Sequence, residues 1–278
     1  MTPQRFHLHL VSDATGETVA AVARACLVQF DDVETLTHPW SLVRTRGQLE
    51  RVVAGIKAKP GVVLATLVDS AIRGQLEEAC RDLKVPCISV LDPVMAALAG
   101  YLHVGFSTEP GRQYVLDAEY FRRIDAIHFT LAHDDGQIVH DLANADVILV
   151  GVSRTSKTPT AMYLANRGLK VANVPLVPGC PLPDELLGLN GPLIVGLTMD
   201  PRGLTDVRRS RLTFLDPGRA TDYADPDSVK EELLRARQLF ARYHWPIIDV
   251  SRRSIEEVAA TILQKFNERT QAKTDEPV

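Results

Sequence analysis

A segment rich in hydroxyl and basic residues, between positions 151 and 158, is the clearest candidate for chemistry. It reads G-V-S-R-T-S-K-T and matches the phosphate-binding pattern G-x-x-x-x-G-K-[ST] at Gly151, Lys157 and Thr158. In this pattern, backbone N–H groups surround a phosphate at a helix N-terminus, the lysine contributes a positive charge, and the hydroxyl is a magnesium ligand. We therefore predict that a nucleotide phosphate binds here, with Lys157 catalytic and Thr158 as the metal ligand. The expected nucleotide-binding residues are Gly151, Val152, Ser153, Arg154, Thr155, Ser156, Lys157 and Thr158.

The segment departs from the pattern at Ser156, which stands where the pattern has its second glycine. Glycine adopts a positive φ and allows close backbone approach, and serine does so less readily. The sequence therefore predicts an altered loop geometry. The alternative interpretation is a plain strand–turn–helix connection, in which a serine or threonine caps the helix and no ligand binds.

A second candidate is the segment S-D-A-T-G-E-T at positions 12–18, which also joins a strand end to a helix start. Ligands of open α/β sheets bind outside the carboxyl ends of the strands. Asp13 is therefore a candidate for recognition of a phosphate or a partner. The alternative is that Asp13 or Thr15 caps the following helix.

A third candidate is the run His133-Asp134-Asp135-Gly136. Paired carboxylates beside a histidine can bind Mg²⁺ or remove the proton of a hydroxyl group. We take Asp134 or Asp135 as the candidate proton acceptor. The alternative is a polar turn after a helix.

A fourth candidate is a group of arginines, whose forked donors suit phosphate and phosphopeptide recognition. We expect this group to recognise a phosphate or a protein partner, and the alternative is a solvated helix face. Its members are Arg202, Arg208, Arg209 and Arg211.

Short apolar runs alternate with helical periodicity through both halves of the chain. In the first half, strands are expected at 6–12, 33–36, 62–68 and 85–91, and helices at 18–30, 48–57, 69–83 and from 93. A long loop (104–117) and a helix (120–132) follow. In the second half, strands are expected at 146–150, 171–176, 193–197 and 247–250, and helices at 157–166, 204–212, 229–243 and 254–266. This rhythm predicts an α/β fold of mostly parallel sheets with flanking helices. We place two domains at 1–140 and 141–278, the second resembling P-loop kinases.

Composition limits the class of protein. The 278 residues are 45% hydrophobic and 24% charged, with a net charge of −4, so no bulk nucleic-acid binding is expected. No apolar run approaches the roughly 20 residues that span a bilayer, and the first residues lack the apolar core of a signal peptide. None of the four cysteines lies in a C-x-x-C pair. We therefore expect a cytoplasmic protein with reduced thiols and no membrane partner.

Several motifs together resemble the pyruvate, phosphate dikinase regulatory protein family, to which the phosphoenolpyruvate synthase regulatory proteins are related. They are HLVSDATGET, YFRRIDAIHF, HDDG, GVSRTSKTPTAMYLANRGLKVANVPLVPG and IDVSRRSIEEVAATIL. The resemblance covers roughly residues 5–266. In that family, a serine replaces the second P-loop glycine as a rule, so Ser156 fits the family pattern.

The resemblance implies a bifunctional enzyme. As a kinase, it would use ADP to phosphorylate a threonine of the dikinase, and this would inactivate the dikinase. The dikinase must already be phosphorylated on its catalytic histidine. As a phosphorylase, it would use inorganic phosphate to remove that group and release pyrophosphate. The ADP site would lie at 151–158, and we expect Mg²⁺ to take part. The target would be pyruvate, phosphate dikinase or phosphoenolpyruvate synthase, and a homodimer is one candidate assembly.

Two other functions remain open from the residues themselves. A P-loop does not specify its acceptor, so the chain could be an ATP-dependent kinase of a small molecule. It could also be a nucleotide sensor without transfer activity. A small-molecule kinase would prefer ATP as its donor, whereas the bifunctional regulator would use ADP. A sensor would bind nucleotide without any turnover.

Overall fold

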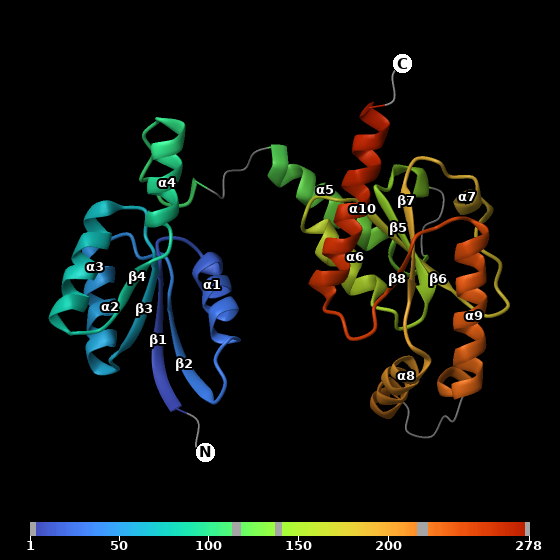
Figure 1. Cartoon of the computed structure of the whole chain (residues 1–278), viewed down its shortest axis with the longest axis horizontal. Coiled ribbons are helices and arrows are strands. Elements are labelled where there is room, and N and C mark those ends of the chain that lie inside the picture. The colour runs from blue at the N-terminus through green and yellow to red at the C-terminus, as the bar shows by residue number, and fades with distance from the viewer. Residues whose placement is uncertain (1–3, 113–117, 137–140, 216–221, 276–278) are drawn as a thin grey trace. The chain divides into compact units, whose positions relative to one another are not determined.

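The computed structural model describes residues 4–112, 118–136, 141–215 and 222–275. It divides into two compact units, Met1–Val115 and Leu116–Val278. The sequence placed the division near residue 140, whereas helix α5 (Ala118–Ala132) belongs to the second unit. Each unit has its own sheet and its own core (Figure 1).

The first unit is a four-stranded parallel sheet with the order β2-β1-β3-β4. Its strands are β1 (Gln4–Ser12), β2 (Val33–Trp40), β3 (Gly61–Thr66) and β4 (Cys87–Ser89), and its helices are α1 (Glu17–Leu27), α2 (Arg46–Ala58), α3 (Ser70–Asp82) and α4 (Asp92–Leu102). Helix α1 packs on the Leu8–Leu10 face of β1, and α2 and α3 pack on the Val11 face. The alternation of side chains along β1 therefore supplies both cores.

The helices of this unit begin where side chains cap them. Thr45 and Gln48 form a reciprocal capping box at α2, and Asp69 accepts hydrogen bonds from two N–H groups at the start of α3. Strand β2 is longer than expected and contains Pro39, which an edge strand tolerates because one of its sides needs no ladder hydrogen bond.

The second unit repeats the plan, with the parallel order β6-β5-β7-β8. Its strands are β5 (Val147–Val152), β6 (Val171–Leu176), β7 (Leu193–Thr198) and β8 (Ile247–Asp249). Its further helices are α6 (Lys157–Ala165), α7 (Asp184–Leu187), α8 (Pro201–Leu215), α9 (Pro226–Arg242) and α10 (Ile255–Asp275), with short 3₁₀ turns η2 (Asp134–Gly136), η3 (Leu142–Asn144) and η4 (Asp222–Ala224). The fold class expected from the sequence is confirmed.

All six residues of β5 are buried, because helices cover both faces of this central strand. Helices α6 and α10 pack on the face that carries Val147 and Leu149, while α8 and α9 pack on the face that carries Ile148 and Val150. Ser254 and Glu257 form a reciprocal capping box at the start of α10. The end of β5 is therefore held rigidly at the carboxyl edge of the sheet.

Candidate phosphate-binding site

The segment 151–158 forms the turn between β5 and α6, as expected. Gly151 lies inside β5, and a Cβ atom there would lie only 2.8 Å from both the carbonyl oxygen of Leu197 and the hydroxyl oxygen of Thr155. A side chain at position 151 would therefore push the turn away from strand β7. Thr155 is fully buried and donates a hydrogen bond of 2.9 Å to the carbonyl of Val152, which closes the turn.

Ser156 has the backbone conformation that glycine favours at this position. Its φ is 58° and its ψ is 23°, in the left-handed region, and Arg154 also has a positive φ of 74°. A non-glycine residue in this region costs roughly 1–2 kcal/mol. Ser156 therefore adopts the left-handed conformation that a glycine would favour at this position, although it departs from the pattern. Ser156 caps α6 without a side-chain hydrogen bond, so its hydroxyl leaves the first-turn N–H groups open to a ligand.

Lys157 is buried at the start of α6, with an exposed fraction of 5%. Its Nζ donates a hydrogen bond of 3.0 Å to the carbonyl of Val152. Burial lowers the pKa of Lys157 to about 8, while the nearby carboxylates of Asp135 and Asp134 act in the opposite direction. An anion arriving at this ammonium group would replace part of its lost hydration.

The two acids of the third motif reach the same site. The Thr158 hydroxyl donates to Asp134 Oδ1 at 2.9 Å, and the Asn173 amide donates to the same oxygen at 2.6 Å. The Asn173 amide nitrogen also lies 3.3 Å from Asp135 Oδ1 and 3.1 Å from the Thr158 oxygen. Asp135 is exposed and lines the cavity of the loop, whereas Asp134 is half-buried behind Thr158.

These oxygens suit Mg²⁺, which takes one or two carboxylates and completes its shell with water and phosphate oxygens. The Thr158 hydroxyl donates its hydrogen bond to Asp134 and accepts one from the Asn173 amide, which leaves one lone pair of its oxygen for a cation. Within the described ranges there is no group of three or more His, Cys, Asp or Glu residues that could hold a metal unaided. A magnesium ion here would depend on the phosphates of a ligand.

His133, by contrast, has a structural place. Its ring stacks on Phe129 with the ring centres 3.9 Å apart, and its Nδ1 lies 2.8 Å from the Phe129 carbonyl oxygen. Its own carbonyl accepts a hydrogen bond from the N–H of Asn173. This holds the turn η2 against strand β6, and so places Asp134 and Asp135.

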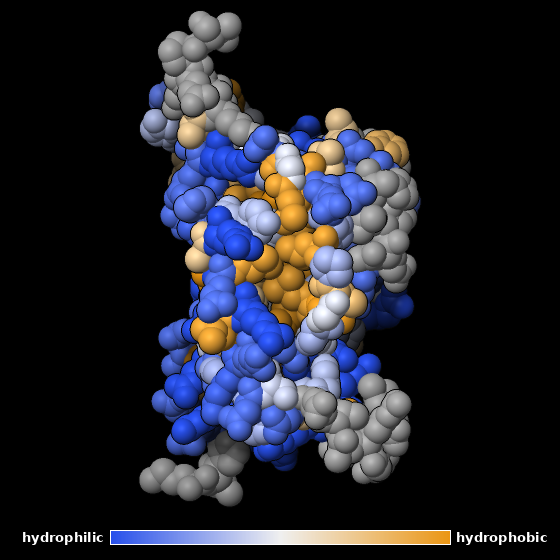
Figure 2. Space-filling view, turned by 90° about the vertical axis from the view of Figure 1, so that its right-hand side faces the viewer, coloured by the Kyte–Doolittle hydropathy of each residue, from blue (hydrophilic) through white to orange (hydrophobic). Residues whose placement is uncertain are grey.

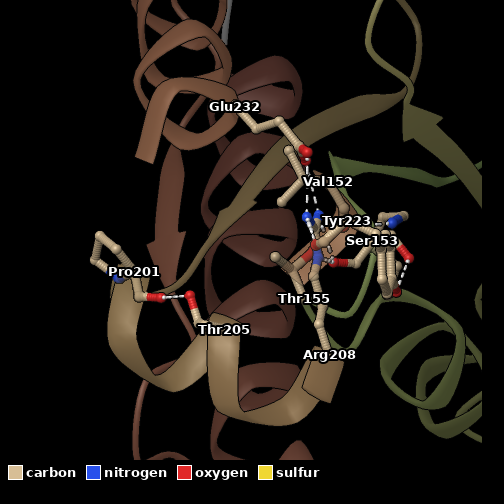
Figure 3. Close-up of polar contacts among 9 residues, drawn as sticks. Val152, Ser153, Thr155, Pro201, Thr205, Arg208, Tyr223 and Glu232 are labelled. Atoms are coloured by element: carbon tan, nitrogen blue, oxygen red, sulfur yellow. Dashed lines mark hydrogen bonds and ion pairs between the residues drawn. The ribbon is translucent and has the colours of Figure 1, made fainter. Parts of the chain in front are cut away.

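Arg208 differs from the other arginines of its motif, because it is buried with an exposed fraction of 1%. Figure 3 shows its guanidinium group between Glu232 of α9 and the loop after β5. It forms two hydrogen bonds with the Glu232 carboxylate, at 2.7 and 3.1 Å, and one with the Tyr223 carbonyl at 2.8 Å. It also reaches the Ser153 carbonyl at 3.3 Å and lies over the Tyr223 ring. Arg208 therefore fixes the phosphate loop and is not a surface residue open to a partner.

Arg202, Arg209 and Arg211 are exposed on α8, as a recognition surface or a solvated face would require. Arg202 and Arg209 line a shallow cavity with Lys230 of α9. Asp13 belongs to the first unit, whereas this loop belongs to the second. The structure thus brings 151–158 together with Asp134 and Asp135, and separates the arginine motif into one buried residue and three exposed ones.

The loop opens into a cavity of about 290 Å³, lined by Asp135, Lys157 and Thr158 among others. A neighbouring cavity of about 430 Å³ shares Ser153 with it, and a third of about 300 Å³ continues along α9 past Leu176 and Leu239. Figure 2 faces the α7 and α9 side of this unit, where apolar residues gather in a hollow bordered by hydrophilic ones. The loop therefore adjoins a surface with room for more than a phosphate.

Sequence reasoning missed Asn173, Tyr223 and Glu232. Asn173 had a visible signal, since it is the one strongly polar residue in the strand V-A-N-V-P-L and is 1% exposed. Tyr223 and Glu232 had none, because they reach the loop only through the packing of η4 and α9.

The site thus has the features of a phosphate-binding turn in an α/β phosphotransferase. The family model of the kinase/pyrophosphorylases matches residues 8–263. The chain belongs to this family.

The chain is 62% identical to a protein of Paramagnetospirillum magneticum, over 95% of this chain and 85% of that protein. It is 57% identical to a protein of Rhodospirillum rubrum, over 96% and 97%, and 53% identical to one of Caulobacter vibrioides, over 93% and 82%. The provisional name of all three is pyruvate, phosphate dikinase regulatory protein.

None of the helices in the described ranges has the length and apolar character needed to cross a membrane.

The lowered pKa of Lys157 predicts a proton linkage. Near pH 8.5 much of the free protein carries a neutral Lys157, and a bound phosphate favours the charged form, so we expect binding of a phosphate ligand such as ADP to take up a proton. ADP affinity then falls as the pH rises above about 8. Calorimetry at pH 8.5 in two buffers of different ionisation enthalpy measures the uptake. A Lys157→Met variant that takes up the same number of protons contradicts this assignment.

The ion pair of buried Arg208 with half-buried Glu232 predicts a large effect from a single truncation. Arg208→Ala leaves the Glu232 carboxylate without its partner, and the cost approaches the roughly 3–5 kcal/mol of a fully buried pair. It also releases the Ser153 carbonyl, so ADP affinity falls. Urea unfolding and ADP titration measure both effects. The matched control is Arg211→Ala on the same helix, which is exposed and changes stability by less than about 0.5 kcal/mol. Equal behaviour of the two variants contradicts the role of Arg208.

Proposed function

We propose that this chain regulates pyruvate, phosphate dikinase by transferring the β-phosphoryl group of ADP to a threonine of that enzyme, and by removing it with inorganic phosphate. The observation that carries the proposal is the buried Lys157 ammonium group at the start of α6, which lies in one cavity with Asp135 and Thr158. The family and the names of the relatives support the choice of target.

The forward reaction forms a bond between the threonine oxygen and the β-phosphorus, and breaks the bond between that phosphorus and the bridging oxygen. AMP leaves, and the threonine proton passes to a carboxylate. In the reverse direction, an oxygen of inorganic phosphate attacks the threonyl phosphorus, pyrophosphate forms, and the threonine oxygen regains a proton. Phosphoryl transfer needs positioning and charge neutralisation more than covalent help from the protein.

The residues divide these tasks. Lys157 and the first-turn N–H groups of α6 would neutralise and hold the transferred phosphate. Thr158 and Asp134 would hold Mg²⁺, which supplies charge neutralisation when bound. Asp135 is the better candidate for the proton acceptor, because its carboxylate is exposed in the cavity while Asp134 accepts hydrogen bonds from Thr158 and Asn173.

The test uses ADP labelled on its β-phosphate, together with pyruvate, phosphate dikinase phosphorylated on its catalytic histidine. We expect label on a dikinase threonine, and its loss as pyrophosphate after inorganic phosphate is added. Lys157→Ala should abolish both activities. No label on this dikinase, with label on phosphoenolpyruvate synthase, would change the target. Preference for ATP and a small-molecule acceptor would indicate a metabolite kinase, and nucleotide binding without any turnover would indicate a sensor.

Asp135→Asn separates the proton acceptor from the binding groups. The variant keeps the size of the side chain and removes its basicity, so the transfer rate should fall about 10²–10⁴-fold while the ADP dissociation constant stays within a factor of about three. Single-turnover transfer and ADP titration measure the two quantities. Asp134→Asn is the comparison, and we expect it to weaken the dependence on Mg²⁺. Undiminished transfer by the Asp135 variant would move the proton acceptor elsewhere.

The exposed arginines of α8 are the proposed docking surface for the dikinase. Changing Arg202, Arg209 and Arg211 to Glu should raise the KM for the dikinase at least about tenfold and leave ADP affinity unchanged. Arg208 must stay intact in this variant, because it supports the loop. An unchanged KM would show that the partner docks on another face.

A further inference from the structure

Asn173 is a polar residue in the otherwise apolar strand β6, beside the candidate site. Asparagine is depleted in strands, and a buried amide must find hydrogen-bond partners. The side chain is 1% exposed, and its oxygen Oδ1 has no partner among the described residues. An apolar residue would suit the packing of β6 better, because it would leave no buried oxygen unpaired. The strand therefore carries a residue that its own packing does not call for, which points to a role in the site that Asn173 contacts.

The amide group of Asn173 joins three oxygen atoms of the site. Its nitrogen Nδ2 lies 2.6 Å from Asp134 Oδ1, 3.1 Å from Thr158 Oγ1 and 3.3 Å from Asp135 Oδ1. An amide has two N–H groups, so three acceptors share two donors. These acceptors also decide which way the amide points, since the opposite orientation would turn Oδ1 toward two carboxylates. The two acids and the hydroxyl therefore depend on one donor group for their relative positions.

The backbone of Asn173 holds the same turn. Its N–H donates a hydrogen bond of 2.9 Å to the carbonyl of His133, the residue before the two acids. The backbone and the side chain of one strand residue thus bind three consecutive residues, 133–135. Because the strand is part of the sheet, it gives the turn a fixed support.

Asp135 needs this support more than Asp134 does. Its φ of 50° and ψ of 33° lie in the left-handed region, where a residue other than glycine persists when its surroundings hold it. Among the described residues, the Asn173 amide is the one hydrogen-bond donor to the Asp135 carboxylate, whereas Asp134 also accepts from Thr158. The contact to Asp135 is long, and hydrogen bonds of this kind often shorten when the substrate binds.

We propose that Asn173 is a positioning residue of the transfer reaction. Its amide holds the carboxylates of Asp135 and Asp134 and the oxygen of Thr158 in the relative positions that proton transfer and cation binding require. This inference rests on the proposed function, in which Asp135 accepts the threonine proton. Asn173 acts through these three residues. Transfer rates depend steeply on such placement, since an error of about 1 Å can cost about 10²-fold.

The first test is Asn173→Val, which removes the amide and suits a buried strand, so that the fold should be kept. Urea unfolding checks the fold. At saturating Mg²⁺, we expect the single-turnover transfer rate from labelled ADP to fall about 10²-fold, while the ADP dissociation constant stays within a factor of about three. Equal losses of transfer rate and of ADP affinity would contradict a positioning role.

The matched control is Thr160→Val on α6. Thr160 is also fully buried, and its hydroxyl likewise has no partner among the described residues. The variant removes a buried polar group close to the loop without touching the two acids. We expect its transfer rate to stay within a factor of about two of the wild-type rate.

A double-mutant cycle separates positioning from general damage to the unit. If Asn173 acts through Asp135, then adding Asn173→Val to Asp135→Asn should lower the transfer rate by less than about threefold at saturating Mg²⁺. A variant that only loosens the unit would lose its full factor again in that background.

Binding of Mn²⁺ gives a readout that needs no transfer. Electron paramagnetic resonance measures free Mn²⁺ in the presence of the whole chain and ADP. Asn173→Val should weaken Mn²⁺ binding about 10–100-fold, as is typical when a residue that orients metal ligands is lost. A wild-type chain without transfer activity would overturn the proposed function and leave this readout to decide the role of Asn173. The positioning role is overturned if the variant keeps the wild-type Mn²⁺ affinity, or if it loses as much transfer rate in the Asp135→Asn background as in the wild type.

Discussion

The desolvated ammonium group of Lys157 is the constraint on which the second unit depends. A buried positive charge is costly unless negative groups stand near it. Asp134 and Asp135 supply that charge from the turn η2, and Asn173 and Thr158 hold the two acids in place. The acids, the amide and the hydroxyl around the loop can therefore be understood as one arrangement, which holds a lysine ready for an anion.

Arg208 shows the other way in which the same unit keeps a buried cation. Its donors are taken up by Glu232, Tyr223 and Ser153, and its guanidinium group lies over an aromatic ring. Among the described residues, Lys157 instead donates a single side-chain hydrogen bond, to the carbonyl oxygen of Val152. The number of hydrogen-bond partners thus distinguishes Arg208, which supports the loop, from Lys157, which a ligand can engage. Both residues belong to motifs that are rich in basic side chains.

The strand and helix pattern could be predicted because each buried strand is a short apolar run and each helix has its own periodicity. The run V-I-L-V-G-V became β5, and a turn joins it to α6 as predicted. The order of the strands was not predictable, since apolar runs of similar composition do not specify their neighbours. That order makes the loop at 12–18 and the loop at 151–158 equivalent in position, with an acid at the first and a lysine at the second.

By itself, the sequence determined the α/β class, the strand–turn–helix at 147–165 and the family, because these depend on local patterns that the chain carries in order. Only the tertiary structure decided that Arg208 is buried while the other three arginines of its motif are exposed, and that Asn173 joins Asp134 to Thr158. The physical reason is that burial and hydrogen-bond pairing depend on which distant elements pack together, and residue spacing along the chain does not contain that information.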